Sequence, residues 1–184
     1  MRNSVHLIFV AAMAKRVIGS EAPVPGYGVE VLQWDIEVSP GRVEVLNGTV
    51  QEVYAQALQI NPNFKLMPVS EKRDLYERNT PVECGTYKLA YKSAIEEGIR
   101  YLRGLSGAPS NGPGDSICAR VSCSYNSAIW WCSGKPYLRT LGSWDWIANS
   151  AQHIVNTCAS EADKVSGLNH EGDDWSTFIS HDDC

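Results

Sequence analysis

The sequence predicts an α+β protein in which two helices cover one face of an antiparallel sheet and disulfides hold these elements together. Three observations lead to this expectation. The chain of 184 residues is 43% hydrophobic and 20% charged, which is ordinary for a globular protein. All six cysteines lie between Cys84 and Cys184. In that part, strand and helix periodicities follow one another as strand-helix-strand-strand-helix-strand, the order of the split β-α-β pattern.

Residues 1–20 have the features of a secretory signal peptide. Arg2 supplies a positive start, residues 5–14 form a short apolar run, and small residues offer cleavage sites near residues 14–22. The apolar run is shorter than the ~20 residues that cross a bilayer. A buried N-terminal strand is the alternative interpretation. The sequence therefore predicts a secreted, extracellular protein.

Residues 21–73 are predicted to form a β-β-α unit that acts as a propeptide. Apolar and polar residues alternate over 29–38, as in a half-buried strand, and residues 43–47 return as a second strand after a Ser-Pro-Gly turn. Thr49 and Glu52 then form a capping box, which opens a helix. Because so small a unit buries too little apolar surface to be stable alone, its expected partner is the cysteine-rich remainder of the chain.

Two short motifs predict modification of the chain. Lys72-Arg73 resembles a dibasic processing site, and it lies in a polar stretch just before the cysteine-rich part. Cleavage there would release the propeptide, whereas a linker between two retained modules is the alternative. Asn47-Gly48-Thr49 is a sequon for N-glycosylation, which we expect on a surface turn.

Residues 74–184 are expected to form the cysteine-rich α+β domain. Its predicted elements are a strand around Cys84, a helix over 94–104, strands over 117–125 and 128–133, a helix over 144–158 and a last strand over 173–180. Ser93, with Glu96 three residues on, and Ser143 are the expected N-caps of the two helices. Cys158 falls on the apolar face of the second helix, so a disulfide from it to a strand would fix that helix to the sheet.

The six cysteines are predicted to form disulfides. They are Cys84, Cys118, Cys123, Cys132, Cys158 and Cys184. An even number of cysteines in an exported chain favours a disulfide framework, and the spacings lack the close Cys-x2-Cys pairs of a zinc site. The sequence does not choose among the possible pairings.

No catalytic residue, metal site or cofactor is predicted. A thiol enzyme needs a free thiolate, such as Cys123 or Cys132, beside a histidine, and bridged cysteines do not provide one. Adjacent residues of a strand face opposite sides, which argues against His170 and Glu171 as a ribonuclease-like acid–base pair. The acidic tail could hold a cation, although solvated turn charges explain it more simply. Its residues are His170, Glu171, Asp173, Asp174, His181, Asp182 and Asp183.

Tryptophan side chains are the predicted candidates for a recognition surface. The residues are Trp130, Trp131, Trp144, Trp146 and Trp175. Trp130 and Trp131 are neighbours on one strand and point to opposite faces, so one is expected in the core and the other exposed or covered by the propeptide. Trp144 and Trp146 lie two apart on a helix and cannot both face inward.

A set of short segments between residues 82 and 184 carries a resemblance to known proteins. The segments are "CGTY", "GIRYLRG", "NGPGDSICARVSCSYNSAIWWCSG", "LGSWDWIANSAQHIVNTC" and "WSTFISHDDC", of which "RVSCSYNSAIWWC" is the most specific. Together they resemble a group of fungal small secreted cysteine-rich proteins. The order of elements and the cysteine layout are also similar to the killer-toxin-like and necrosis-inducing effector class.

This resemblance implies a fungal source, an extracellular location and an effector or toxin-like role. Members of the toxin class are thought to act on target-cell membranes or channels without an active site. That class is often basic, whereas residues 74–184 carry more acidic than basic residues. The departure argues against direct attraction to an anionic channel mouth.

The favoured function is a secreted, non-enzymatic effector or toxin-like protein that acts on a host or competitor cell through surface recognition. Its expected partner is a protein, membrane component or glycan of that cell. The formal net charge of −5 and the lack of a long Lys or Arg run argue against a nucleic acid partner. The alternatives are a secreted, ribonuclease-like hydrolase and a glycan-binding surface protein that uses an exposed tryptophan.

Overall fold

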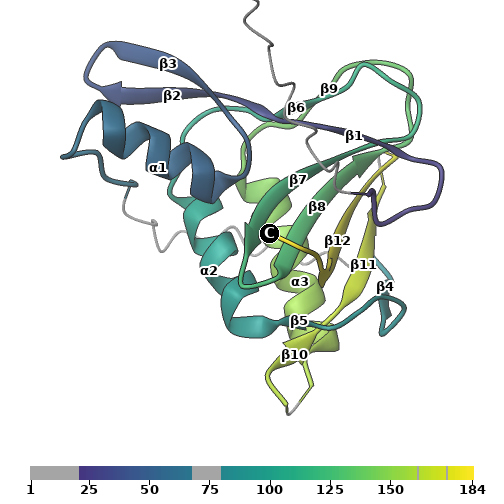
Figure 1. Ribbon diagram of the computed structural model, residues 1–184. Helices are drawn as coiled ribbons and strands as arrows, with labels where there is room; N and C mark the ends of the chain where they lie inside the picture. Colours follow the sequence, from purple (N-terminus) through teal and green to yellow (C-terminus); the bar gives the residue numbers. More distant parts are fainter. Residues whose placement is uncertain (1–20, 68–79, 161, 173) are drawn as a thin grey trace, which may run out of the picture.

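The structure, a computed structural model, describes residues 21–67, 80–160, 162–172 and 174–184. Its centre is a six-stranded sheet with the strand order β1-β7-β8-β12-β11-β4 (Figure 1). The strands are β1 Gly28–Glu30, β4 Val82–Cys84, β7 Ile117–Ser124, β8 Ser127–Ser133, β11 Gly167–Glu171 and β12 Trp175–His181. Neighbouring strands are antiparallel except for β1 and β7, which are parallel.

Helices α2 and α3 cover one face of this sheet (Figure 1). Helix α2 spans Lys92–Arg103 and packs on β7 and β8, while α3 spans Asp145–Cys158 and packs on β4, β11 and β12. The apolar stripes expected from helical periodicity are the buried faces of both helices. They comprise Ile95, Ile99 and Leu102 on α2, and Ile147, Ala151, Ile154 and Val155 on α3.

The expected β-β-α elements are present at the start of the described chain. Strands β2 Gln33–Ser39 and β3 Arg42–Asn47 form an antiparallel hairpin, and helix α1 Val50–Ile60 follows. The capping box is confirmed, because the Thr49 amide and hydroxyl both donate to the Glu52 carboxylate at 2.7 and 2.9 Å. The alternating apolar residues predicted to face inward are buried, namely Leu32 just before β2 and Trp34, Ile36 and Val38 within it.

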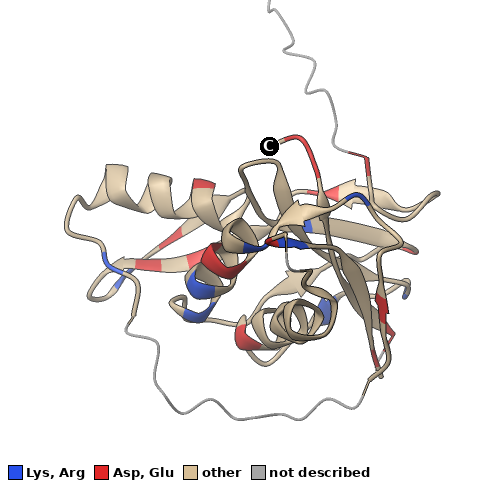
Figure 2. Cartoon of the chain, turned by 90° about the horizontal axis from the view of Figure 1, so that it is seen from below, with Lys and Arg blue, Asp and Glu red and all other residues tan. Residues whose placement is uncertain are grey.

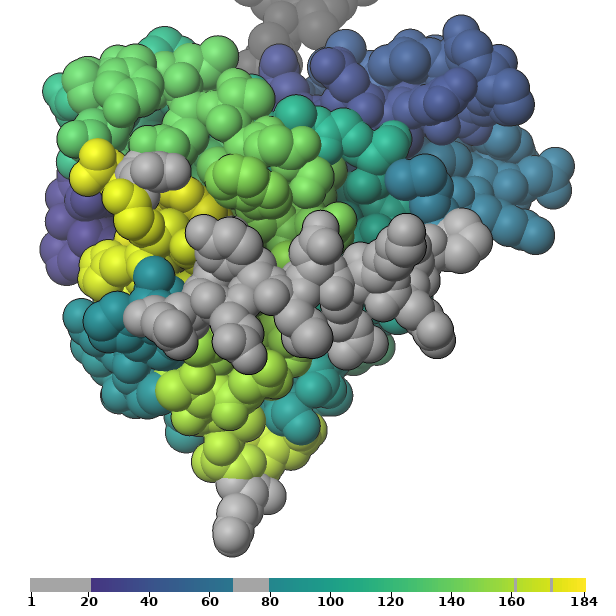
Figure 3. Space-filling view, turned by 180° about the vertical axis from the view of Figure 1, so that it is seen from behind, coloured from purple at the N-terminus to yellow at the C-terminus, as the bar shows by residue number. Residues whose placement is uncertain are grey.

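These elements, together with β1, belong to residues 21–67, here called the N-terminal unit, which shares one core with the cysteine-rich part. The indole of Trp34 stacks on that of Trp144 at the start of α3, with ring centroids 3.7 Å apart. The amide of Gln51 on α1 donates to the Ser122 hydroxyl at 2.7 Å and accepts from the Cys123 backbone amide at 3.1 Å. Figure 3 shows this unit lying against the rest of the molecule.

Each face of the central sheet carries a cluster of buried apolar side chains. On the helix side, Trp131 and Trp175 meet edge to face and join the main core. On the opposite side, Trp130 and Phe178 lie in register on β8 and β12 and form a second cluster with the Cys118–Cys132 disulfide. Residues 22–27 of the N-terminal unit pack against this second cluster.

The sheet differs from the four-stranded antiparallel sheet that was expected. Strand β1 adds a parallel edge beside β7, and β11 forms a hairpin with β12 after α3. Strand β4 consequently pairs with β11 at the other edge. Over the described ranges, the α+β class with three helices, several sheets and three disulfides is confirmed, whereas the split β-α-β arrangement is not.

Two short strand pairs complete the described structure and explain how α2 begins. Strand β5 Ala90–Tyr91 pairs with β10 Lys164–Val165, and β6 Ser110–Asn111 pairs with β9 Arg139–Thr140. The amide of Lys92, the first residue of α2, donates to the Asp163 carbonyl of the turn before β10. The first amide of α2 is therefore satisfied by a backbone carbonyl that is distant in sequence.

The N-caps predicted at Ser93 and Ser143 are wrong. Helix α2 begins one residue before Ser93, and Glu96 pairs with Lys92 at 3.5 Å in place of a capping box. Helix α3 is capped at Trp144, whose side chain stacks on the N-terminal unit. Tertiary contacts therefore set both starts, and neither cap residue provides a side-chain hydrogen bond.

Two predicted segments lie outside the described residues. These are the signal peptide over 1–20 and the processing pair Lys72-Arg73. Both stay predictions, as does release of a propeptide. In the described part of the chain, no helix is both long and apolar enough to cross a membrane.

Candidate functional site

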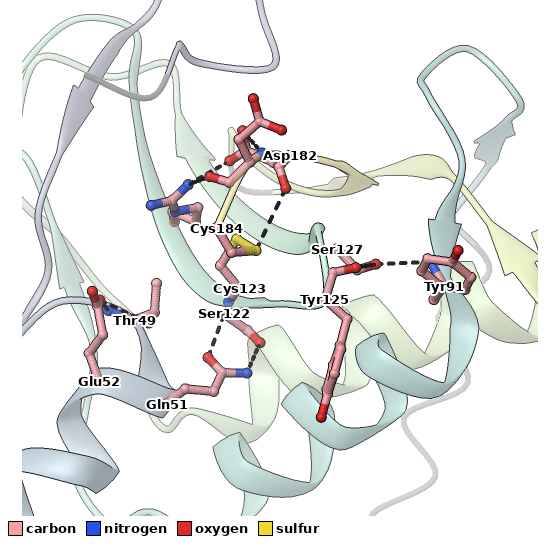
Figure 4. The surroundings of a disulfide bond; sticks show 12 residues. Thr49, Gln51, Glu52, Tyr91, Ser122, Cys123, Tyr125, Ser127, Asp182 and Cys184 are labelled. Atoms are coloured by element: carbon pink, nitrogen blue, oxygen red, sulfur yellow. Dashed lines mark hydrogen bonds and ion pairs between the residues drawn. A yellow bond between two sulfur atoms is a disulfide. The ribbon is translucent and has the colours of Figure 1, made fainter. Parts of the chain in front are cut away.

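The three disulfides join the edges and ends of the fold. Cys84–Cys158 ties β4 to the last residue of α3, so the predicted link from Cys158 to a strand is confirmed. Cys118–Cys132 joins β7 to β8 at directly opposed positions. Cys123–Cys184 fixes the C-terminal residue to the end of β7, beside Gln51 (Figure 4). All described cysteines are bridged, so none of them provides a thiolate nucleophile.

The tip of the β7–β8 hairpin presents the most exposed large hydrophobic side chain among the described residues. Tyr125 is 77% exposed. It forms a two-residue turn with Asn126, and both residues have positive φ angles, 48° and 53°. Turns of this kind favour Asn and Gly, because a bulky side chain is strained at positive φ. An aromatic residue is therefore held at the tip in a backbone conformation that it disfavours.

The backbone around Tyr125 is held on both sides. The Ser127 hydroxyl donates to the Tyr125 carbonyl at 3.1 Å and accepts from the Tyr91 amide at 2.9 Å (Figure 4). The Asp182 amide donates to the Asn126 carbonyl at 3.3 Å. With the Cys123–Cys184 disulfide two residues before the turn, these bonds make the hairpin tip a rigid platform.

Tyr125 forms one wall of a hollow against helix α2. The hollow has a volume of about 360 Å³, and Ser93, Glu97 and Arg100 of α2 line its other side. Leu89 and Tyr91, which precede α2, are also exposed. The Lys164 ammonium lies 3.0 Å from the centroid of the Tyr91 ring. We call the group Leu89, Tyr91, Arg100 and Tyr125 the Tyr125 surface.

The structure buries most of the tryptophans that were predicted to form a recognition surface. Trp130 and Trp131 point to opposite faces as expected. Trp131 lies in the main core, and Trp130 is covered by the N-terminal unit, which was one of the two expected outcomes, so they are 0% and 1% exposed. Trp144 and Trp175 are buried as well. Trp146 is 42% exposed, which confirms that Trp144 and Trp146 do not both face inward.

The histidines and acidic residues of the tail are spread over separate environments. The Glu171 side chain is buried and accepts a hydrogen bond from Asn169, while His170 is exposed on the other side of β11. The predicted opposition of His170 and Glu171 is therefore confirmed. Asp182 pairs with Arg120 at 2.9 Å, and Asp173 lies outside the described residues. In the part of the chain that the structure describes, no group of three His, Cys, Asp or Glu residues is placed to bind a metal.

Asn47 lies on the surface, where a glycan could be attached. It is exposed at the end of β3, and Gly48 after it has a φ of 113°, which suits a turn. Figure 2 shows Lys and Arg residues interspersed with Asp and Glu residues along the described chain. The sequon thus lies on a turn as predicted, and its glycosylation stays a prediction.

Comparison with known proteins gives no relative for this chain. Models of known protein families, curated proteins and solved structures were each compared with it, and none matched. The geometry of the chain itself is therefore what supports a function.

Sequence reasoning missed Tyr125 as a surface residue. The prediction ran the first strand to Tyr125, one residue too far, whereas β7 ends at Ser124 and Tyr-Asn forms the two-residue turn. A tyrosine at the first of these positions is unusual for a two-residue hairpin. The predicted recognition surface consisted of tryptophans, although indole side chains are highly buried on average.

Proposed function

We propose that the chain is an extracellular, effector- or toxin-like protein that binds a protein on a target cell through the Tyr125 surface. It acts by recognition and performs no catalytic step. The observation that carries this proposal is the exposure of Tyr125 at the tip of a hairpin that hydrogen bonds and a disulfide hold in place.

The unfavourable conformational free energy of the Tyr125 backbone, which has a positive φ, favours a functional role for this side chain. A non-glycine residue in the left-handed region costs about 1–2 kcal/mol. The side chain is mostly exposed, so packing offsets little of that cost. Strain that brings no packing gain is characteristic of binding sites. Asn or Gly would make the same turn more stably, and we infer that binding accounts for the tyrosine.

The composition of the Tyr125 surface fits a protein partner. Tyrosine and arginine dominate the energetics of protein interfaces, and Arg100 and Tyr125 both line the hollow beside α2. The exposed Tyr91 is joined to the same hairpin tip through the Ser127 hydroxyl. The hollow could receive one side chain of the partner. Because the tip is already rigid, binding would lose little conformational entropy there.

The disulfide framework supports an extracellular location. Three disulfides within residues 84–184 are typical of proteins that fold in an oxidising compartment. They also lower the entropy of the unfolded chain and so stabilise the folded state. This stability would keep the Tyr125 surface intact outside the cell. The fungal source and the toxin-like class remain part of the proposal, and they rest on the resemblance of residues 82–184.

The test compares the binding of two matched variants to cells. Labelled protein is titrated onto fungal and plant cells, and Tyr125→Asn is compared with Tyr137→Asn, which replaces another exposed tyrosine outside this surface. We expect saturable binding that falls by about tenfold or more in Tyr125→Asn, as for an interface hot spot. Tyr137→Asn should bind like the wild type. Equal binding by both variants, or no saturable binding to any cell of the panel, would contradict the proposal.

A further inference from the structure

A cleft on the sheet face opposite the helices is distinct from the Tyr125 surface. It has a volume of about 330 Å³ and lies at the C-terminal end of β8, next to Gly134, whereas Tyr125 precedes the start of that strand. Leu168 and Phe178, both nearly fully buried, form its floor together with Cys132. Volumes of about 300–1,000 Å³ are usual for small-ligand sites, so this cleft suits one small ligand.

Two tyrosines give the cleft aromatic walls. Tyr87 meets Phe178 edge to face, with ring centroids 5.5 Å apart. Burial raises the pKa of Tyr87, and the nearby Glu83 carboxylate raises it further, so the phenol keeps its proton and can donate a hydrogen bond. Tyr27 comes from the N-terminal unit, and a Cβ at Gly134 would lie 3.5 Å from its hydroxyl. The cleft is thus complete only when the N-terminal unit is present.

The lysine and the aspartate that line the cleft, Lys135 and Asp174, are paired with each other. Lys135 binds Asp174 at 2.8 Å, and this hydrogen bond raises the pKa of Lys135. The imidazole of His170 lies 3.7 Å from the Glu83 carboxylate and 3.0 Å from the Ser176 hydroxyl. Positive charge at the rim is therefore compensated, which disfavours phosphate or carboxylate ligands. The cleft still offers hydrogen-bond donors and acceptors, and these suit an uncharged polar ligand.

We propose that this cleft binds one neutral sugar ring of a glycan. A pyranose has an apolar C–H face and a circumference of hydroxyl groups. The aromatic and aliphatic floor would contact the apolar face, while His170, Ser176 and the tyrosine hydroxyls would exchange hydrogen bonds with the sugar hydroxyls. This site is independent of the protein-binding role of the Tyr125 surface, and either proposal can fail without the other.

The test titrates sugars against the full chain by calorimetry and saturation-transfer NMR. The probes are the methyl glycosides of glucose, mannose, galactose and N-acetylglucosamine, with glucose 6-phosphate and methyl glucuronide as charged counterparts. The double variant His170→Ala/Ser176→Ala removes two rim groups, and Gly134→Leu fills the cleft without removing any. His181→Ala is the matched control, because His181 is an exposed histidine of the same strand as Ser176 and lies outside the cleft.

We expect saturable binding of at least one neutral glycoside, weakened about tenfold or more by the double variant, since two hydrogen bonds are lost. Gly134→Leu should abolish binding, whereas His181→Ala and Tyr125→Asn should leave it unchanged. The proposal is overturned if no neutral glycoside binds, if only the charged sugars bind, or if the cleft variants bind like the wild type. Turnover of a p-nitrophenyl glycoside that is lost in His170→Ala would likewise overturn it, in favour of a hydrolase.

Discussion

Replacement of Trp34 tests whether the N-terminal unit and the cysteine-rich part form one core. The Trp34 side chain is 1% exposed, stacks on Trp144 and donates from its indole nitrogen to the Gly48 carbonyl at 2.7 Å. Tryptophan-to-alanine changes in cores cost about 3–5 kcal/mol, and an unpaired carbonyl adds about 1 kcal/mol. Trp34→Ala should therefore lower the free energy of unfolding by about 4–6 kcal/mol.

Two further variants divide this loss into its parts. Trp34→Phe keeps an aromatic ring against Trp144 but removes the indole donor, so its cost should be about 1–2 kcal/mol. Val45→Ala changes an exposed residue on the outer side of the same hairpin, and its effect should stay within about 0.5 kcal/mol.

Urea unfolding of the oxidised protein provides the assay, followed by near-ultraviolet circular dichroism for the aromatic core and by far-ultraviolet circular dichroism for the backbone. One core predicts a single transition that shifts as a whole in Trp34→Ala. A loss below about 1 kcal/mol would refute this reasoning. So would a second, unshifted transition that belongs to the cysteine-rich part alone.

Three other predictions follow from the same packing. Removal of the helix–sheet disulfide in Cys84→Ala/Cys158→Ala opens a loop with a sequence separation of 74 and should cost about 4 kcal/mol in urea unfolding, whereas a loss below about 1 kcal/mol would count against it. Gly98→Ala should destabilise the fold by about 1–3 kcal/mol despite better helix propensity, because its Cβ would collide with the Ser122 side chain; a gain in melting temperature would refute this clash. Cleavage after Arg73 should leave the two pieces associated in gel filtration, and their separation without denaturant would contradict a shared core.

The elements with clear periodicity could be predicted from the sequence. The inner residues of β2, the helix of the capping box at Thr49 and the apolar stripes of α2 and α3 are found where the patterns indicated them. The direction of Cys158 followed from the same helical periodicity, and its disulfide with Cys84 agrees with it. These patterns predict structure because a helix or strand with one buried face places apolar residues at the repeat of that helix or strand.

Elements that depend on distant contacts could not be predicted. Strand β11 carries buried Asn169 and Glu171, and the Asn169 amide donates to both Glu171 and Ser150, so the helix side of β11 lacks an apolar alternation. Strand β1 has three residues and exists only through its pairing with β7. The strand pattern placed Trp130 and Trp131 on opposite faces, but it could not decide whether Trp130 is exposed or covered, because its cover comes from residues 22–27.

The same limit applied to the candidate sites. The Tyr125 surface combines the hairpin tip with α2, and the cleft combines Tyr27 with residues more than a hundred positions further along the chain, such as His170. Neither grouping has a sequence spacing that could reveal it. A tyrosine at a turn position was the one local signal, and its meaning depends on the exposure that the fold gives it.

The most direct test of recognition through an exposed surface measures folding stability and cell binding together in Tyr125→Asn and Tyr125→Ala. Asparagine tolerates a positive φ and alanine does not, so Tyr125→Asn should be more stable than Tyr125→Ala by about 1 kcal/mol. Both variants should nevertheless lose cell binding to the same extent, because both lack the aromatic ring. Binding that stays at the wild-type level, or that falls only in step with stability, would contradict the account.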